Sequence, residues 1–170
     1  MMRFKAAIGI ILCVLLAACG HVNPPRNSPA DTFKAQLVRQ QIGETGYDIS
    51  LPKNYRLKLL PGKDYTIYLF QPKDTTDTIS WHGGIFRGNF PGMSAPDSVN
   101  FKKDSTLKSP FLDTIRTWLR FSYKTSCEIQ VIVPAVYGDG EPTKMYAFGW
   151  APMRDLPKLL SVLSTVQIER

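Results

Sequence analysis

The chain has 170 residues, of which 44% are hydrophobic and 21% are charged, with a formal net charge of +7. This length suits one domain with a hydrophobic core and is too short for two domains of ordinary size. The charge excess permits attraction to anionic headgroups, to peptidoglycan carboxylates or to an acidic partner, without selecting among them. The sequence lacks the usual aromatic-basic recognition motifs, so we expect no nucleic-acid partner.

Residues 1–18 have the composition of a secretory signal peptide. Arg3 and Lys5 form a positive segment, and an apolar run over residues 6–15 follows them. That run is shorter than the roughly 20 residues that a membrane-spanning helix needs. We therefore expect this signal peptide to be cleaved from the mature protein.

The segment Leu16-Ala17-Ala18-Cys19 ends the apolar run and resembles the lipobox of bacterial lipoprotein precursors. The resemblance implies cleavage before Cys19 and attachment of lipid, such as palmitate, to that residue. Several acyl chains anchor a protein stably, because each buried CH₂ contributes about 0.8 kcal/mol. Gly20 follows where enterobacterial lipoproteins retained at the inner membrane carry an aspartate. In a Gram-negative cell, the resemblance thus implies a lipoprotein of the outer membrane that faces the periplasm.

Cleavage changes what the mature chain contains. Removing 18 of 170 residues leaves 152, and the loss of Arg3 and Lys5 lowers the formal charge from +7 to +5. Cys13 leaves with the signal and Cys19 is acylated, so we expect no intramolecular disulfide. Cys127, the third cysteine, lies at an apolar position of an alternating segment, which predicts a buried side chain.

Residues 19–30 are polar and rich in proline, which predicts a tether between the lipid and the folded domain. Residues 31–170 are expected to form a single globular domain. Its first segment, residues 31–42, fits a short helix, although the second half fits the start of a strand equally well.

From residue 46 onwards, apolar and polar residues alternate with a period of two, which is typical of half-buried strands. Gly83 and Gly84 interrupt one of these segments and indicate a bulge or a close approach of the backbone. Strands are predicted over residues 47–51, 55–59, 65–70, 78–90, 127–133 and 144–150.

Residues 110–123 are ambiguous between a helix and a strand. Ser109 and Pro110 fit a helix start, whereas the β-branched and aromatic residues from Ile115 onwards favour a strand. We favour the strand. Residues 91–109 are predicted to form a long surface loop, a type of segment that is often functional, and residues 134–143 a second loop.

A C-terminal helix is predicted to begin at Asp155, with Pro157 in its first turn. Four leucines share one face of this helix, and residues 166–168 fit a short edge strand. The leucines are Leu156, Leu159, Leu160 and Leu163.

These elements predict an α+β domain in which a mainly antiparallel β-sheet is packed by a C-terminal amphipathic helix. The order of elements loosely resembles the PsbP-like α/β/α group of small exported proteins. That resemblance lies in the pattern alone and carries no residue-specific motif.

The sequence shows few residues that could carry catalysis. A Ser-His-Asp or Cys-His enzyme would have to use His82, and no nucleophile turn accompanies it. One domain histidine and one free cysteine are too few for a zinc site, and Asp139-Gly140-Glu141 fits a turn better than a calcium site. Nothing marks two acids among Asp97, Asp104, Asp113 and Glu128 as a catalytic pair. We expect no catalytic residue, no cofactor and no metal.

Binding residues are predicted near a cluster of positive charge. On a strand, Arg116, Trp118 and Arg120 share one face, and arginine and tryptophan favour binding hot spots. This face, together with His82, is the predicted binding site for an acidic partner or headgroup. The alternative is that the arginines are solvated while Trp118 packs under a loop.

The sequence therefore predicts a membrane-anchored, non-enzymatic periplasmic lipoprotein that binds another macromolecule. One form is an immunity protein that blocks a toxin delivered into the periplasm, as small lipoproteins encoded beside type VI secretion effectors do. Another is an accessory protein of an envelope assembly. The alternatives are a lipid-tethered hydrolase acting on peptidoglycan or an ester, and a carrier for a small apolar ligand.

Overall fold

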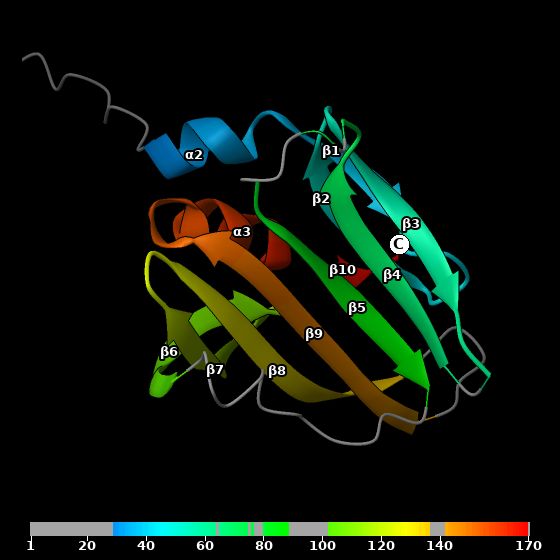
Figure 1. Ribbon diagram of the computed structural model, residues 1–170. Coiled ribbons are helices and arrows are strands. Elements are labelled where there is room, and N and C mark those ends of the chain that lie inside the picture. The colour runs from blue at the N-terminus through cyan, green and yellow to red at the C-terminus, as the bar shows by residue number, and fades with distance from the viewer. Residues whose placement is uncertain are drawn as a thin grey trace, which may run out of the picture.

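The computed structural model describes residues 29–63, 65–74, 76, 80–88, 102–136 and 142–169. The predicted signal peptide and nearly all of the tether, including Cys19, lie outside these residues. The fold is mostly antiparallel β-sheet with one short C-terminal helix packed on it (Figure 1). The elements are α2 (Pro29–Lys34), β1 (Leu37–Gln41), β2 (Tyr47–Pro52), β3 (Tyr55–Pro61), β4 (Tyr65–Pro72), β5 (His82–Gly88), β6 (Lys102–Phe111), β7 (Thr114–Tyr123), β8 (Ser126–Val136), β9 (Pro142–Pro152), the 3₁₀ turn η1 (Met153–Asp155), α3 (Leu156–Leu163) and β10 (Gln167–Ile168).

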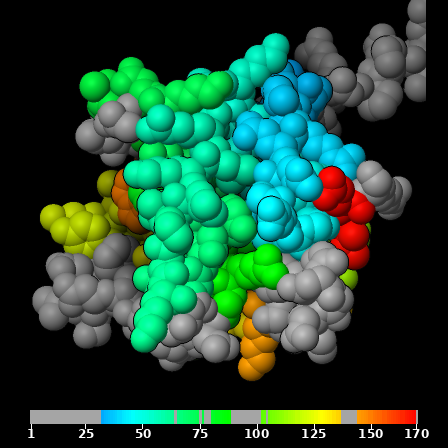
Figure 2. Space-filling view, turned by 90° about the vertical axis from the view of Figure 1, so that its right-hand side faces the viewer, coloured from blue at the N-terminus to red at the C-terminus, as the bar shows by residue number. Residues whose placement is uncertain are grey.

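The strands form two sheets where the sequence predicted one. The large sheet has seven strands in the order β3-β4-β5-β9-β8-β7-β6, and the small sheet has three in the order β1-β2-β10. The central pairing of β5 with β9 joins residues 60 to 68 positions apart in the chain, with His82 opposite Trp150. In Figure 2 the molecule is seen from the side of the β3 edge, with β3 and β4 beside the N-terminal elements.

The core lies between the large sheet on one side and the small sheet with α3 on the other. Successive side chains of a strand point to opposite faces, so every second residue of the large sheet faces this core. Cys127 is fully buried, as the alternation predicted. Residues of both sheets and of α3 share one hydrophobic cluster, which includes Ile49, Leu51, Phe70, Ile85, Ile129, Val131, Ala147, Leu159, Val162 and Leu163.

Helix α3 packs closely on β9. A Cβ atom at Gly149 would lie 2.7 Å from Leu159, so the absence of a side chain lets the helix approach the sheet. Asp155 stands at the predicted N-cap position, but its side chain does not cap the helix. Its carboxylate instead accepts hydrogen bonds from Lys158 at 2.8 Å and from Arg154 at 3.4 Å. The bond from Lys158 is the main reason that the pKa of Asp155 lies below its usual value.

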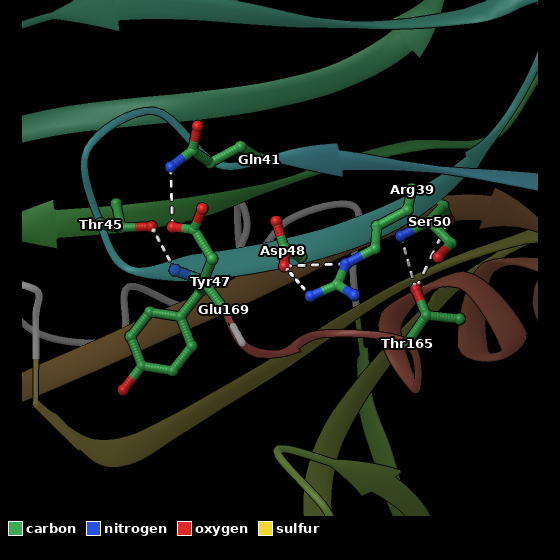
Figure 3. Close-up of polar contacts among 8 residues, drawn as sticks. All are labelled: Arg39, Gln41, Thr45, Tyr47, Asp48, Ser50, Thr165 and Glu169. Atoms are coloured by element: carbon green, nitrogen blue, oxygen red, sulfur yellow. Dashed lines mark hydrogen bonds and ion pairs between the residues drawn. The ribbon is translucent and has the colours of Figure 1, made fainter.

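Polar contacts connect the small sheet to the rest of the chain (Figure 3). Asp48 is almost fully buried and pairs with Arg39 on β1, whose Nε donates to its carboxylate at 2.8 Å. Thr165, just after α3, accepts a hydrogen bond from the backbone N–H of Ser50 at 2.8 Å. Gln41 donates to Glu169 at 2.7 Å. These bonds tie β1 and the segment after α3 to β2, and tie β1 to the C-terminal end of the described residues.

The strand predictions for the first half are correct to within a few residues, and residues 31–42 divide into α2 and β1. The strand interpretation of residues 110–123 is also correct, since β7 begins at Thr114. The loop prediction for residues 91–109 is wrong from Lys102 onwards, because β6 pairs there with β7. The loop prediction for residues 134–143 is wrong at both ends, because β8 runs to Val136 and β9 begins at Pro142. Residues 89–101 and 137–141 lie outside the described part.

No helix among the described residues is long and apolar enough to cross a bilayer.

Candidate functional site

The predicted Arg-Trp-Arg stripe is not an exposed surface. Trp118 has no exposed area, packs edge-on against Phe111 with ring centres 5.4 Å apart, and donates from Nε1 to the carbonyl of Ser109 at 3.4 Å. Arg116 and Arg120 flank it on the same face and are half-buried. Trp118 is therefore a core residue and offers no surface to a partner.

His82, the fourth predicted binding residue, lies on the opposite face of the large sheet. Gly149 faces α3, so its neighbours Phe148 and Trp150 must point away from the core. We call this second surface the outer face. The strand register places His82 on β5 and Glu128 on β8, one on each side of Trp150 on β9. Three strands thus bring a histidine, a tryptophan and a carboxylate into one row.

These side chains line an open hollow of about 430 Å³ that we call the Trp150 depression, bounded by His82, Glu128, Phe148 and Trp150. The rings of His82 and Trp150 are stacked, with centres 5.4 Å apart and an angle of 22° between their planes. Phe148 lies over Gly84, where a Cβ atom would come within 2.7 Å of its ring. Because Gly84 has no side chain, the phenyl ring of Phe148 can lie over it and form part of the wall of the depression.

An aromatic row continues from the depression along the outer face. Tyr146 is stacked on Phe148 with ring centres 5.6 Å apart, and it meets Phe86 edge-on at 6.3 Å. Phe86 is in turn stacked on Tyr65 at 5.0 Å. Tyr146 and Phe86 are buried, whereas Phe148 and Trp150 are partly exposed and His82 is exposed. The row is therefore accessible at both ends, at Tyr65 and at the Trp150 depression, and is buried between them.

The carboxylate of Glu128 is held in place by a neighbour on the same strand. Nε2 of Gln130, which is almost fully buried, donates to Oε1 of Glu128 at 2.5 Å. Burial raises the pKa of Glu128, and the hydrogen bond from Gln130 partly opposes this effect. Burial and the nearby Glu128 together raise the pKa of Tyr146 far above its usual value, so this phenol stays protonated.

His82 is exposed over part of its surface, yet its ring face lies against Trp150. Burial of that face lowers the pKa of His82, and a hydrogen bond with the backbone of Ser80 acts in the opposite direction. The imidazole is therefore mainly neutral at pH 7. The depression combines aromatic walls, a neutral histidine and one carboxylic acid.

Two further hollows adjoin the positive residues of the chain. One of about 720 Å³ lies on the other side of Trp150 and is lined by Lys124, Met153 and Arg154 among others. The other, of about 400 Å³, lies between Tyr47, Arg116 and Val136. Within the described ranges, Nε of Arg116 is buried there without a hydrogen-bond partner.

Metal-ligating side chains do not gather in the described part of the chain, where no three of His, Cys, Asp and Glu lie together. Asp139 and Glu141, which the sequence offered as a calcium site or a turn, lie outside it.

Three residues of the depression were not predicted. The alternation over residues 144–150 already places Tyr146, Phe148 and Trp150 on one strand face, but it does not say which face is buried. Glu128 was considered only as one of several acids, and the pairing of β8 with β9 gives it its neighbours.

The chain matches no protein-family model and no curated protein.

Proposed function

We propose that this chain is a lipid-anchored protein of the bacterial cell envelope, attached through Cys19, that acts by binding another macromolecule. Two features support the proposal. The Leu16-Ala17-Ala18-Cys19 segment has the chemistry that lipid attachment needs, and a partly exposed aromatic depression lies on the sheet face that α3 leaves uncovered. In a Gram-negative cell its place is the periplasmic side of the outer membrane.

The Trp150 depression is the observation that carries the binding proposal. Exposed aromatic side chains beside a few polar groups are typical of the centre of a protein interface, because they bury much apolar area at small entropic cost. Within this class, an immunity protein that blocks an incoming toxin and an accessory subunit of an envelope assembly are both consistent with the site.

The binding proposal can be tested by photo-crosslinking in the cell. The full chain carries a photoreactive phenylalanine analogue in place of His82, and a control carries the same analogue in place of Lys158, which is exposed on α3. We expect a discrete adduct from position 82 and not from position 158. The purified partner should then bind the full chain saturably, and Trp150→Ala should weaken that binding. Equal adducts at both positions, or none, would contradict the proposal.

The anchor is tested separately by labelling with radioactive palmitate. The wild-type chain should incorporate label and lose its signal peptide, whereas Cys19→Ser should do neither. Equal labelling of the two chains would show that Cys19 is not the site of acylation.

A lipid-tethered hydrolase is the second candidate, because the depression places His82 and Glu128 on either side of Trp150. A neutral imidazole and a carboxylic acid of raised pKa are suitable general base and acid. This candidate predicts that the purified full chain degrades murein or a chromogenic ester, and that His82→Ala and Glu128→Gln each abolish the activity. Activity that survives both substitutions would exclude this pair.

A further inference from the structure

The walls of the Trp150 depression have the chemistry of a cation site. The faces of aromatic rings carry partial negative charge and attract organic cations, most strongly at tryptophan. Here Trp150 and Phe148 contribute such rings, and Glu128 adds a carboxylate at the same hollow. Gln130, the next residue but one on the same strand, holds that carboxylate in position by a hydrogen bond.

The charges around the depression favour a cation over an anion. The titratable groups on the outer face of its three strands are His82 on β5, Glu128 on β8, and Tyr146 and Lys144 on β9. Lys144 lies six residues before Trp150 and does not line the depression. Of these, the phenol is protonated and the imidazole is mainly neutral at pH 7. Glu128 is thus the group that can bring charge to the site, and a bound cation would stabilise its ionised form.

The neighbouring hollow, which Trp150 also lines, has two positive side chains, Lys124 and Arg154, and both have contacts of their own. The Lys124 ammonium lies 5.1 Å from the centre of the Tyr123 ring. Arg154 donates to Asp155 at 3.4 Å. Neither contact directs a cation of the chain itself into the Trp150 depression.

We propose that the Trp150 depression binds an alkylammonium group, as presented by a lysine side chain on the surface of the partner. This inference rests on the proposed binding function and names the chemistry that the site recognises. The volume of about 430 Å³ accommodates one long side chain, and the open mouth lets it enter from a protein surface. The butyl stem of lysine would lie along Trp150 and Phe148, with the ammonium directed at Glu128.

Trp150 itself supplies the signal for a binding experiment. The chain has three tryptophans, and Trp81 and Trp118 are 5% and 0% exposed. A fluorescence change on binding at the depression therefore reports Trp150. The probe is Nα-acetyl-lysine N-methylamide, and its Nε-acetylated form is the matched neutral control, because acetylation removes the charge.

We expect the full chain to bind the charged probe saturably, with a dissociation constant on the order of millimolar. The acetylated probe should bind about tenfold more weakly. Glu128→Gln, which keeps the shape of the side chain, should weaken binding of the charged probe about fivefold. Asp113→Asn removes one acidic group at a distant, exposed turn and should leave the affinity unchanged.

Equal affinities for the two probes, or an unchanged affinity in Glu128→Gln, would overturn the inference. These outcomes are separable from failure of the proposed function. A partner that crosslinks at position 82 while the charged probe does not bind leaves the binding function intact and removes lysine recognition. A probe that binds while no partner is found contradicts the function and leaves the ammonium site standing.

Discussion

Gly83 lies where β5 passes between the ring of Phe70 and the backbone of β9. A Cβ atom there would come within 2.4 Å of Phe70 and within 2.5 Å of the carbonyl oxygen of Phe148. A side-chain ring can move aside, but a carbonyl in a paired strand cannot move without breaking the ladder. The close approach indicated by the glycine pair is thus a packing requirement at this position.

Gly83→Ala should therefore destabilise the protein by about 3 kcal/mol, near the upper end for overpacked cores. Gly84→Ala is the matched control on the other face. The atoms nearest to its Cβ would be in the side chains of Phe148 and Leu69, which can move aside, so a loss of about 1 kcal/mol is expected. Urea denaturation of both variants measures the difference. Equal losses of stability in the two variants would mean that the contact with the carbonyl oxygen of Phe148 does not explain the cost of a side chain at position 83.

Burial raises the pKa of Glu128. This shift makes the stability of the fold depend on pH, and its direction follows from the direction of the shift. A carboxyl group that binds its proton more tightly in the folded state lowers stability as pH rises from the unfolded-state value through the folded-state value. At neutral pH its ionised form is therefore unfavourable for folding.

Glu128→Gln should accordingly raise the free energy of unfolding at pH 7, and the gain should disappear below about pH 4.5, the ordinary value of the carboxyl. Denaturation of both proteins at pH 7 and pH 4 measures this difference. Because His82 is present in both chains, its own titration cancels in the comparison. A variant less stable than the wild type at pH 7 would show that Glu128 gains more from its contacts than it loses by burial.

At the scale of elements, the turn between β6 and β7 is built from unusual residues. Leu112 and Asp113 join the strands with φ values of 51° and 55°, a region that L-residues rarely adopt. Two-residue hairpins of this kind normally use glycine or asparagine. Leu112 packs on the core, so its side chain offsets part of the strain, whereas Asp113 is exposed.

Asp113→Gly should raise the stability by about 0.5 kcal/mol, because glycine adopts positive φ without a steric penalty. Asp113→Ala is the control and should lower the stability by about 1 kcal/mol, since alanine lacks both the freedom of glycine and a local hydrogen-bonding group. Thermal denaturation of the pair measures the difference. A stabilising alanine would show that the backbone at residue 113 is not strained.

Local pattern was sufficient for most elements but not for β6. Few of its residues are apolar, so their composition indicates a loop. The strand forms because β7 provides a ladder of backbone partners, an interaction that side-chain composition does not encode. Pairings such as β10 with β2, some 120 residues apart, are equally invisible in a single sequence.

The candidate site was predictable only in part for the same reason. His82 was identified as a residue, but its neighbours Trp150 and Glu128 come from strands that follow it by 68 and 46 positions. The Arg116-Trp118-Arg120 face was identified correctly as one face of a strand. Its orientation towards the core depends on how β7 packs, which the spacing of three residues cannot specify.

At the scale of the whole molecule, the two sheets depend on one core. The same buried cluster contains Ile49 and Leu51 of the small sheet, Phe70 and Ile129 of the large sheet, and Leu163 of α3. Neither sheet can lose its partner without exposing that shared apolar surface to water. The described domain should therefore unfold as a single cooperative unit.

Far-UV circular dichroism and tryptophan fluorescence should then give coincident urea transitions. Trp81, which packs against Tyr55 and Phe70, reports the core between the sheets. Trp118 reports the β6–β7 end. Two separated transitions would indicate that one of the sheets unfolds on its own.

The open large sheet has a consequence for protein kept at high local density, as it would be on a membrane surface. Among the described residues, β3 and β6 are its terminal strands, and edge strands are the places where sheets of two molecules can pair. Both strands carry exposed cations, including Lys58, Lys102 and Lys108. The edge strands of two molecules therefore repel each other when they approach. This repulsion depends on the ionic medium, because the screening length shrinks from about 10 Å at 0.1 M salt to about 3 Å at 1 M. Light scattering should therefore detect self-association in concentrated salt first, and Lys58→Ser should lower the salt concentration at which it begins.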